Sequence, residues 1–271
     1  MPIATNFDAV PTEECERWED FVGATRLTDG TPLDPIYRGH AECTWALVPP
    51  SAREQFEQVK LLRGRGQDVR SGGPAPSEQI HYFERLATGL PNVDLTALDP
   101  IDVEALARHH GLCSNLLDWT RSHYAAAFFA FTSALDRAND GRLLAGTLGQ
   151  SAMFWPTQPV CIWRLGVTRD LVVPGEFEVL SSHSAVNYWQ KAQLGAFTRL
   201  THEEHLDIVS YLAERNLLGR LKRFVIPGSE TLKALRDLEA MNITYATLFP
   251  DLRGAAIQAN VGMTWRLTGG V

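Results

Sequence analysis

The sequence is organised around the stretch Leu106-Ala-Arg-His-His-Gly-Leu-Cys-Ser-Asn-Leu-Leu-Asp-Trp-Thr120 and the apolar run of residues 125–134 that follows it. The first part predicts an amphipathic helix that ends at His110, because Gly111 can adopt the left-handed conformation that closes a helix. The apolar run predicts a helix that is buried on all sides. Polar groups before such a helix are held rigidly and meet the positive end of its dipole. The connection between the two helices is therefore the first candidate for a functional site.

The composition is that of an ordinary globular protein. The chain has 271 residues, of which 45% are hydrophobic and 21% are charged, and it can form a sizeable core. Its net charge of −7 argues against a general nucleic-acid binder, which needs a positive surface to neutralise phosphates. No apolar run is long enough to cross a bilayer, and the first residues do not resemble a secretory signal. The four cysteines show no metal-ligand spacing. We therefore expect a reduced, cytoplasmic chain with no membrane segment and no metal site.

Local patterns predict short strands mixed with separate helices. Helices are expected after the capping residues Thr12, Ser51 and Ser77, over 100–110, 125–134, 202–216 and 229–241, and after Asp251. Strands are expected at 36–40, 43–48, 160–165, 177–180, 194–198, 221–226 and 263–267. This mixture favours a single α+β domain over residues 35–271, with a mixed or antiparallel sheet of short strands packed against helices. Residues 1–34 are expected to form an N-terminal helical extension.

Several motifs together carry a resemblance to a known family. They are Tyr37-Arg-Gly-His40, Trp45-Ala-Leu-Val-Pro-Pro-Ser51 with Arg53, Leu106-Ala-Arg-His-His-Gly-Leu112, Leu116-Leu-Asp-Trp-Thr120, Ala125–Ala130, Ala192-Gln-Leu-Gly-Ala-Phe-Thr198 and Ile243-Thr-Tyr-Ala-Thr-Leu-Phe-Pro-Asp251. With these motifs in the same order, the chain resembles the FRG-domain proteins, a bacterial and phage family named for a Phe-Arg-Gly motif. The family's activity is poorly defined, and its members are sometimes encoded near defence or toxin genes.

The chain departs from the family pattern at two places. Tyr37 stands where the family has phenylalanine, a harmless exchange for an aromatic residue on a strand. Cys113-Ser114-Asn115 stands where the family usually has Pro-Thr-Arg. An arginine with five donors is therefore missing here, and any anion contact that it makes in other members is in doubt.

Arg38 is the first candidate for a ligand contact. An arginine on a short strand before a glycine can offer a bidentate fork to a phosphate, and the glycine lets a ligand approach the backbone closely. ADP-ribosyltransferases of the Arg-Ser-Glu type use such an arginine to orient NAD. The alternative is a structural ion pair, for example with Asp118, and the sequence leaves both open.

His109 and His110 are candidates for a general base or a phosphate donor. Adjacent residues on a helix point in different directions, so both imidazoles cannot easily face one ligand. The simpler interpretation is that one ring packs while the other is exposed or bonds to a loop carbonyl. A further hypothesis is a metal-free nuclease or phosphoesterase that uses this pair of histidines. The net negative charge of the chain argues against it. Zinc binding is not expected, since no second ligand lies at the required spacing.

The remaining candidates flank the buried helix or lie late in the chain. One of Asp118 and Thr120 is expected to cap that helix, and Trp119 is either a core residue or a stacking partner for a base. Opposite Arg38, the ribose of a bound nucleotide needs a late polar side chain. The candidates for it are Glu176, Glu178 and Gln193. Glu176-Phe-Glu178 has Glu-x-Glu spacing without the usual Ser-Thr-Ser, and surface alternation explains it more simply.

These residues lead to two hypotheses about function. The first is an ADP-ribosyltransferase-like fold and activity, in which an enzyme or toxin uses NAD in conflicts between bacteria and phages. Its catalytic candidates are Arg38, His109, His110, Asp118, Thr120, Glu178 and Gln193, and its cofactor contacts are Arg38, His110 and Trp119. The alternative is a non-enzymatic module of phage defence that binds a nucleotide or a protein in the same cleft.

Overall fold

The computed structural model describes residues 7–26, 34–53, 76–90, 93–148, 153–181, 188–201 and 207–268. The strands in these ranges are β1 (Thr12–Glu14), β2 (Pro35–His40), β3 (Leu116–Thr120), β4 (Val160–Gly166), β5 (Phe177–Leu180), β6 (Gly195–Leu200) and β7 (Leu221–Ile226). They form one seven-stranded sheet in the order β1-β7-β4-β2-β3-β6-β5. β1 pairs with β7 in parallel and the other neighbours are antiparallel, so the sheet is mixed. The predicted α+β class is confirmed.

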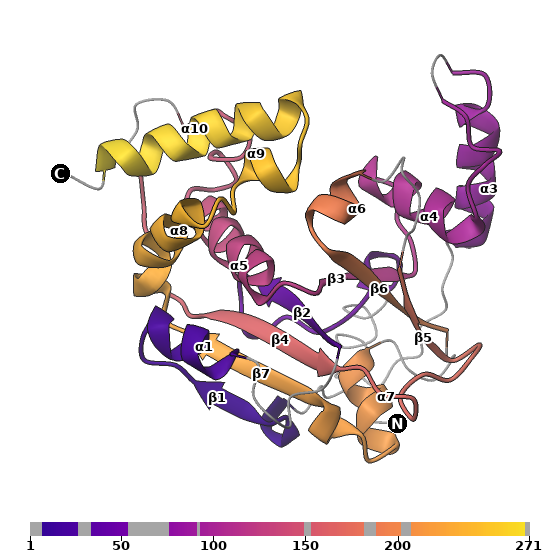
Figure 1. Ribbon diagram of the computed structural model, residues 1–271, viewed down its shortest axis with the longest axis horizontal. Coiled ribbons are helices and arrows are strands. Elements are labelled where there is room, and N and C mark those ends of the chain that lie inside the picture. Colours follow the sequence, from indigo (N-terminus) through magenta and orange to yellow (C-terminus); the bar gives the residue numbers. More distant parts are fainter. Residues whose placement is uncertain are drawn as a thin grey trace, which may run out of the picture.

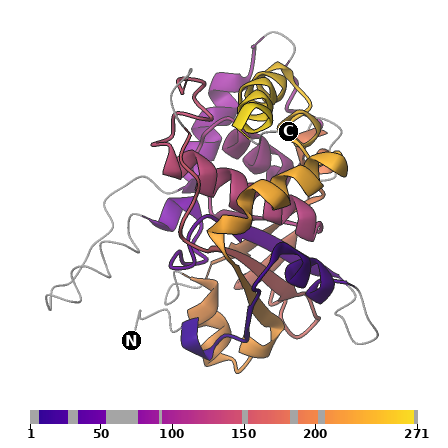
Figure 2. The ribbon, with the colours of Figure 1, turned by 90° about the vertical axis from the view of Figure 1, so that its left-hand side faces the viewer.

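Helices cover both faces of this sheet (Figure 1). They are α1 (Trp18–Ala24), α3 (Pro76–Ala87), α4 (Pro100–His109), α5 (His123–Ala138), α6 (Tyr188–Ala192), α7 (Ile208–Glu214), α8 (Thr231–Ala240), α9 (Tyr245–Leu248) and α10 (Leu252–Thr268). Helices α5, α8 and α10 pack on one face around a core that includes Phe131, Leu235 and Val261 (Figure 2). Helix α7 packs on the other face, around Trp163 and Leu212.

The apolar run forms the central helix α5, as predicted. Phe128 and Phe131 are buried, whereas Phe129 is half-buried. The expected cap is wrong: Ser122 accepts the hydrogen bond of the Ala125 backbone N–H at 3.1 Å. Asp118 and Thr120 cannot cap α5, because both belong to strand β3.

Gly39 explains how α5 comes so close to the sheet. A Cβ atom at this position would lie 1.9 Å from the backbone oxygen of Ala126 and 2.8 Å from the backbone nitrogen of Ala130. Only glycine therefore lets the helix pack directly on β2. We expected a ligand to approach the backbone at Gly39, but helix α5 occupies this space.

The centre of the sheet opens between β2 and β3. These strands share a single residue pair, Tyr37 with Thr120, whereas β2 and β4 are paired along the whole of β2. Beyond that pair, no strand among the described residues pairs with β3 on this side. The guanidinium of Arg38 takes this place, because its NH1 donates to the backbone oxygen of Asp118 at 2.6 Å.

Several local predictions are wrong. Residues 12–14 form strand β1 and not the start of a helix, because pairing with β7 outweighs the capping pattern. Residues 43–48 form a turn and an irregular segment in place of a strand, and residues 263–267 continue helix α10.

Parts of two predicted helices, 54–62 and 202–206, lie outside the described residues.

Candidate functional site

A cavity of about 920 Å³ lies where β2 and β3 diverge. Residues of β2, β3 and the segment 44–53 line one end of it. Helices α4, α5 and α6 and the segment from α9 into α10 line the other. Its charged side chains are Arg38, Arg53, Arg108, Asp118, Asp251 and Arg253, and His109 also lines it. With four arginines and two aspartates, the cavity has the opposite charge balance to the chain as a whole.

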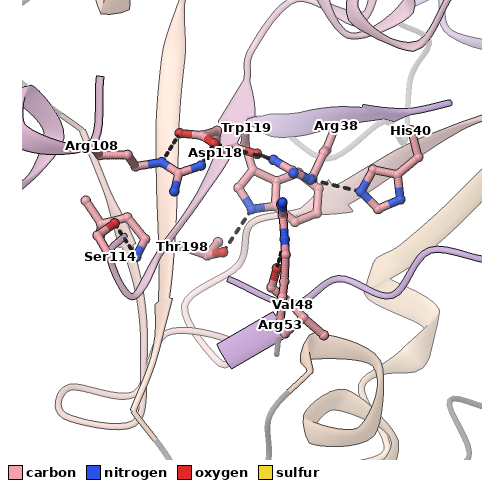
Figure 3. A network of polar contacts seen from close by, with 10 residues as sticks. Arg38, His40, Val48, Arg53, Arg108, Ser114, Asp118, Trp119 and Thr198 are labelled. Atoms are coloured by element: carbon pink, nitrogen blue, oxygen red, sulfur yellow. Dashed lines mark hydrogen bonds and ion pairs between the residues drawn. The ribbon is translucent and has the colours of Figure 1, made fainter. Parts of the chain in front are cut away.

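Asp118 organises two of these arginines (Figure 3). Arg108 contacts both carboxylate oxygens: its Nε donates to Oδ1 at 2.7 Å and its NH2 donates to Oδ2. NH1 of Arg38 lies 3.7 Å from Oδ2. Burial alone raises the pKa of Asp118, but the hydrogen bond and the charge of Arg108 outweigh it and hold this pKa below its ordinary value. The carboxylate is therefore ionised at neutral pH and 46% of its side chain is exposed.

His40 holds the other side of Arg38. Nε of Arg38 donates to Nε2 of His40 at 3.0 Å, while Nε1 of Trp163 points to Nδ1 at 3.2 Å. Burial, followed by the charge of Arg38, lowers the pKa of His40 well below its ordinary value. An imidazolium would turn N–H groups toward both donors, so the geometry also favours the neutral ring. Burial lowers the pKa of Arg38 to about 10, and this arginine stays charged at neutral pH.

Arg53 adds a third guanidinium to this group. Its Nε donates to the backbone oxygen of Val48 at 3.4 Å, and within the described residues it forms no ion pair. Burial and then the charge of Arg108 lower the pKa of Arg53. Arg38 and Arg108 are mostly enclosed, with 15% and 14% of their side chains exposed. Three arginines thus surround one carboxylate and leave an excess of positive charge.

The far end of the cavity is aromatic. The rings of His109 and Trp189 are stacked, with centroids 3.7 Å apart and planes at 21°. Nε1 of Trp189 donates to Oδ2 of Asp251 at 2.8 Å, and Oδ1 of Asp251 accepts the backbone N–H of Gly254 at 2.7 Å in the first turn of α10. Asp251 therefore fixes the indole to the start of a helix. Phe249 extends this wall, 6.3 Å from the ring of His109.

Most of the predicted site residues meet in this cavity. Those that line it are Arg38, His109, Asp118, Trp119, Thr120 and Gln193. The hydroxyl of Thr120 donates to the backbone oxygen of Gln193 at 2.6 Å. The side-chain amide of Gln193 donates to the oxygen of Leu248 at 3.1 Å, so both contacts hold the wall together. The indole of Trp119 is buried in the core beneath α7, where its Nε1 donates to Thr198.

Three predicted residues lie outside the cavity. His110 follows the last turn of α4 and is exposed. Glu178 is bound by Arg199 at 3.3 Å, and the same arginine donates to the buried Glu104 at 2.5 Å. Glu176 accepts from Arg215 at 2.5 Å. Both glutamates therefore have arginine partners of their own.

The sequence interpretation missed Arg53, Arg108, Trp189 and Asp251 as site residues. Arg53 and Arg108 lie within the family motifs, but their convergence depends on β3, a strand that the pattern did not predict. Cys113-Ser114-Asn115 supplies no cation, and Asn115 instead accepts the hydroxyl of Ser51 at 2.7 Å. Arg53 and Arg108 provide positive charge near the segment Cys113-Ser114-Asn115.

Comparison with protein-family models matches residues 34–139 to the FRG domain. The chain contains an FRG domain. The matched residues span β2, α3, α4, β3 and α5, so they include Arg38, Arg53, Arg108, Asp118 and His109. Trp189 and Asp251 come from the part of the chain that follows the FRG domain.

Neither the comparison with curated proteins nor that with solved structures gave a match. The ADP-ribosyltransferase-like fold therefore stays a prediction. Within the described ranges, no helix has the length and apolar character that crossing a bilayer requires. In the same ranges, no three His, Cys, Asp or Glu side chains gather where they could ligate one metal ion.

Proposed function

We propose that the cavity binds a phosphorylated nucleotide, with NAD as the first candidate. The observation that carries this proposal is the group formed by Arg38, Arg53 and Arg108 around the single carboxylate of Asp118. Arg38 and Arg108 are mostly enclosed and share the one carboxylate of Asp118, which is costly, and an anionic ligand that supplies a further counter-ion lowers this cost. Guanidiniums also match the paired oxygens of phosphate groups.

The size and the walls of the cavity support the nucleotide class. Pockets for small ligands and cofactors typically enclose about 300–1,000 Å³, and a volume of about 920 Å³ is near the upper end of that range. An arginine end joined to an aromatic end fits a ligand with phosphates at one part and a base at another. We propose Arg38, Arg53 and Arg108 as the phosphate contacts.

The transferase form of this proposal needs charge near the sugar carbon that becomes positive in the transition state. Of the late candidates, Gln193 lines the cavity. The carboxylates that line the cavity are those of Asp118 and Asp251. Glu178 is held by Arg199 outside the cavity, and its proposed role requires a rearrangement of that pair. Such an enzyme would consume NAD in bacterial or phage conflict.

A binding module is the second candidate function, and one observation favours it. Both carboxylates that line the cavity already have strong partners, Asp118 in Arg108 and Asp251 in Trp189 and Gly254. Neither is free to stabilise a cation without losing these bonds. In this form the nucleotide is a signal or a structural ligand.

The test is to titrate the purified chain with NAD in a calorimeter and to follow nicotinamide release over time. Binding with release supports the transferase, and binding without release supports the module. We expect Arg108→Gln to weaken binding in either case. The proposal is contradicted if NAD, ADP-ribose and ADP all fail to bind.

A further inference from the structure

Resting on the proposed nucleotide site, we infer that His109 is the platform on which the base of the ligand stacks, with Trp189 as its support. The proposed function concerns the phosphate contacts, whereas this inference concerns what selects a nucleotide over other phosphorylated compounds. It assigns the chemical class of the ligand as an aromatic base joined to a phosphate or pyrophosphate.

The first argument is the position of the two rings. The indole of Trp189 is only 9% exposed and is itself covered, whereas His109 is exposed and lines the cavity. One face of the imidazole lies on the indole at a centroid distance of 3.7 Å. Because His109 lines the cavity, part of its ring surface is available to a ligand there.

The second argument is that the platform is held rigidly. Trp189 is bound through its Nε1 to Asp251, which also accepts the Gly254 N–H at the start of α10. A Cβ at Gly254 would lie 1.9 Å from the backbone oxygen of Phe249, so this corner is tightly packed. A surface that is ordered before binding loses little entropy when a flat ligand stacks on it.

The third argument is electrostatic. Burial, followed by the neighbouring His110, lowers the pKa of His109, so its ring is neutral at pH 7. A neutral imidazole backed by an indole presents an extended π-surface, and every base has a complementary π-face. Three of the four cavity arginines lie around Asp118, whereas Arg253 lies near the aromatic end, where its charge also lowers the pKa of His109. Stacking and charge are thus provided by different residues.

The test compares ligands with and without a base. Calorimetric titrations with ADP-ribose, ADP and inorganic pyrophosphate are made on the wild-type chain and on His109→Ala, His109→Phe and His81→Ala. Removing a stacking partner typically weakens binding by roughly 5-fold to 150-fold per base. We expect His109→Ala to lose this factor for ADP-ribose and ADP while its affinity for pyrophosphate is unchanged. His109→Phe should keep most of the affinity, because its ring remains flat and aromatic.

His81→Ala is the control, since it removes an exposed imidazole of α3 that does not line the cavity. It should bind all three ligands like the wild type. The inference is overturned if His109→Ala binds the base-containing ligands as tightly as the wild type, or if it loses pyrophosphate to the same extent. In the first outcome the phosphate site, and with it the proposed function, still stands. If the wild-type chain binds none of the three ligands, the proposed function itself has failed.

Discussion

Arg108, at the end of helix α4, binds both carboxylate oxygens of Asp118 on strand β3. The contact joins a helix and a strand that are separated by a short turn, and it lies where β3 diverges from β2. Because Arg38 donates to the backbone oxygen of the same aspartate, one residue positions two guanidiniums in the cavity.

Replacing Asp118 by asparagine should change stability and anion affinity in opposite directions. The variant loses the counter-ion of Arg108 and Arg38 and leaves them mutually repelling. Breaking a buried pair costs about 3–5 kcal/mol, and because the Asp118 side chain is 46% exposed we expect roughly 1–3 kcal/mol. Pyrophosphate should bind more tightly, because its negative charge replaces the carboxylate charge that the arginines have lost. Urea denaturation and calorimetry measure the two effects.

Asp170→Asn is the control for this prediction, because Asp170 pairs with Arg220 at 3.2 Å on the surface. Exposed pairs contribute about 0–1 kcal/mol, so its stability should change little. A fall in both the stability and the pyrophosphate affinity of Asp118→Asn would show that Asp118 supports the site in some other way.

Gly39→Ala should be far more harmful than its size suggests. The new methyl group meets the backbone of α5 at Ala126, which cannot move without shifting the helix from the sheet. Overpacking usually costs about 1–3 kcal/mol, and a backbone clash should reach or exceed the upper end. Gly23→Ala is the matched control: it lies in helix α1 with open space around it, and alanine there should add about 0.5–1 kcal/mol. Equal thermal stability of the two variants would contradict this explanation.

The sequence was informative wherever local chemistry decides the structure. Asp99 accepts the Asp102 N–H with Pro100 in the first turn, and Gly111 has a φ of 97°, so both ends of α4 follow the predicted pattern. The apolar run of α5 was equally clear. A pair with Asp118 was one of the two alternatives for Arg38, and NH1 of Arg38 lies 3.7 Å from Oδ2 of Asp118.

The prediction failed where the local structure depends on pairing between strands that are far apart in the sequence. Residues 12–14 carry a helix-start pattern, but they add a parallel strand to β7, which lies about two hundred residues later. Residues 116–120 are a short stretch with three apolar residues among five, and nothing local distinguishes such a stretch from the approach to a helix. Without β3, the convergence of Arg53, Arg108 and Asp118 cannot be seen. The partners of Glu178 are likewise set by the register of β5 and β6, which pairs it with Arg199.

Stability should fall with pH below about 6.5, in part because of His40. Its pKa in the folded chain is depressed by burial and by Arg38, so the unfolded chain binds a proton that the folded chain does not. The free energy of unfolding therefore decreases as pH falls from the ordinary histidine pKa toward the folded value, by up to about 1.4 kcal/mol per pH unit for this residue. Urea titrations at pH 7.5, 6.5 and 5.5 measure the slope.

His40→Gln removes this titration while leaving an amide that can accept from Arg38. Its unfolding free energy should vary less between pH 6.5 and 5.5 than that of the wild type. His109 and His123, whose pKa values are also lowered by burial, supply the slope that remains. Identical slopes in the two proteins would mean that His40 takes up a proton in the folded state.

The central claim is that the arginine cluster binds the phosphates of a nucleotide, and Arg53 offers the cleanest test. Within the described residues it has no ion-pair partner, so Arg53→Gln removes a ligand contact without leaving a carboxylate unpaired. The measurement is calorimetric titration of inorganic pyrophosphate and NAD into the wild type, Arg53→Gln and Arg85→Gln. The last variant removes one charge from exposed helix α3, away from the cavity.

A hydrogen bond to a charged group contributes about 1.5–3 kcal/mol, which corresponds to roughly 10-fold to 150-fold in Kd. We predict that the wild type and Arg85→Gln bind both ligands equally well and that Arg53→Gln weakens both by such a factor. Absence of binding to the wild type, or an unchanged Kd in Arg53→Gln, would contradict the claim.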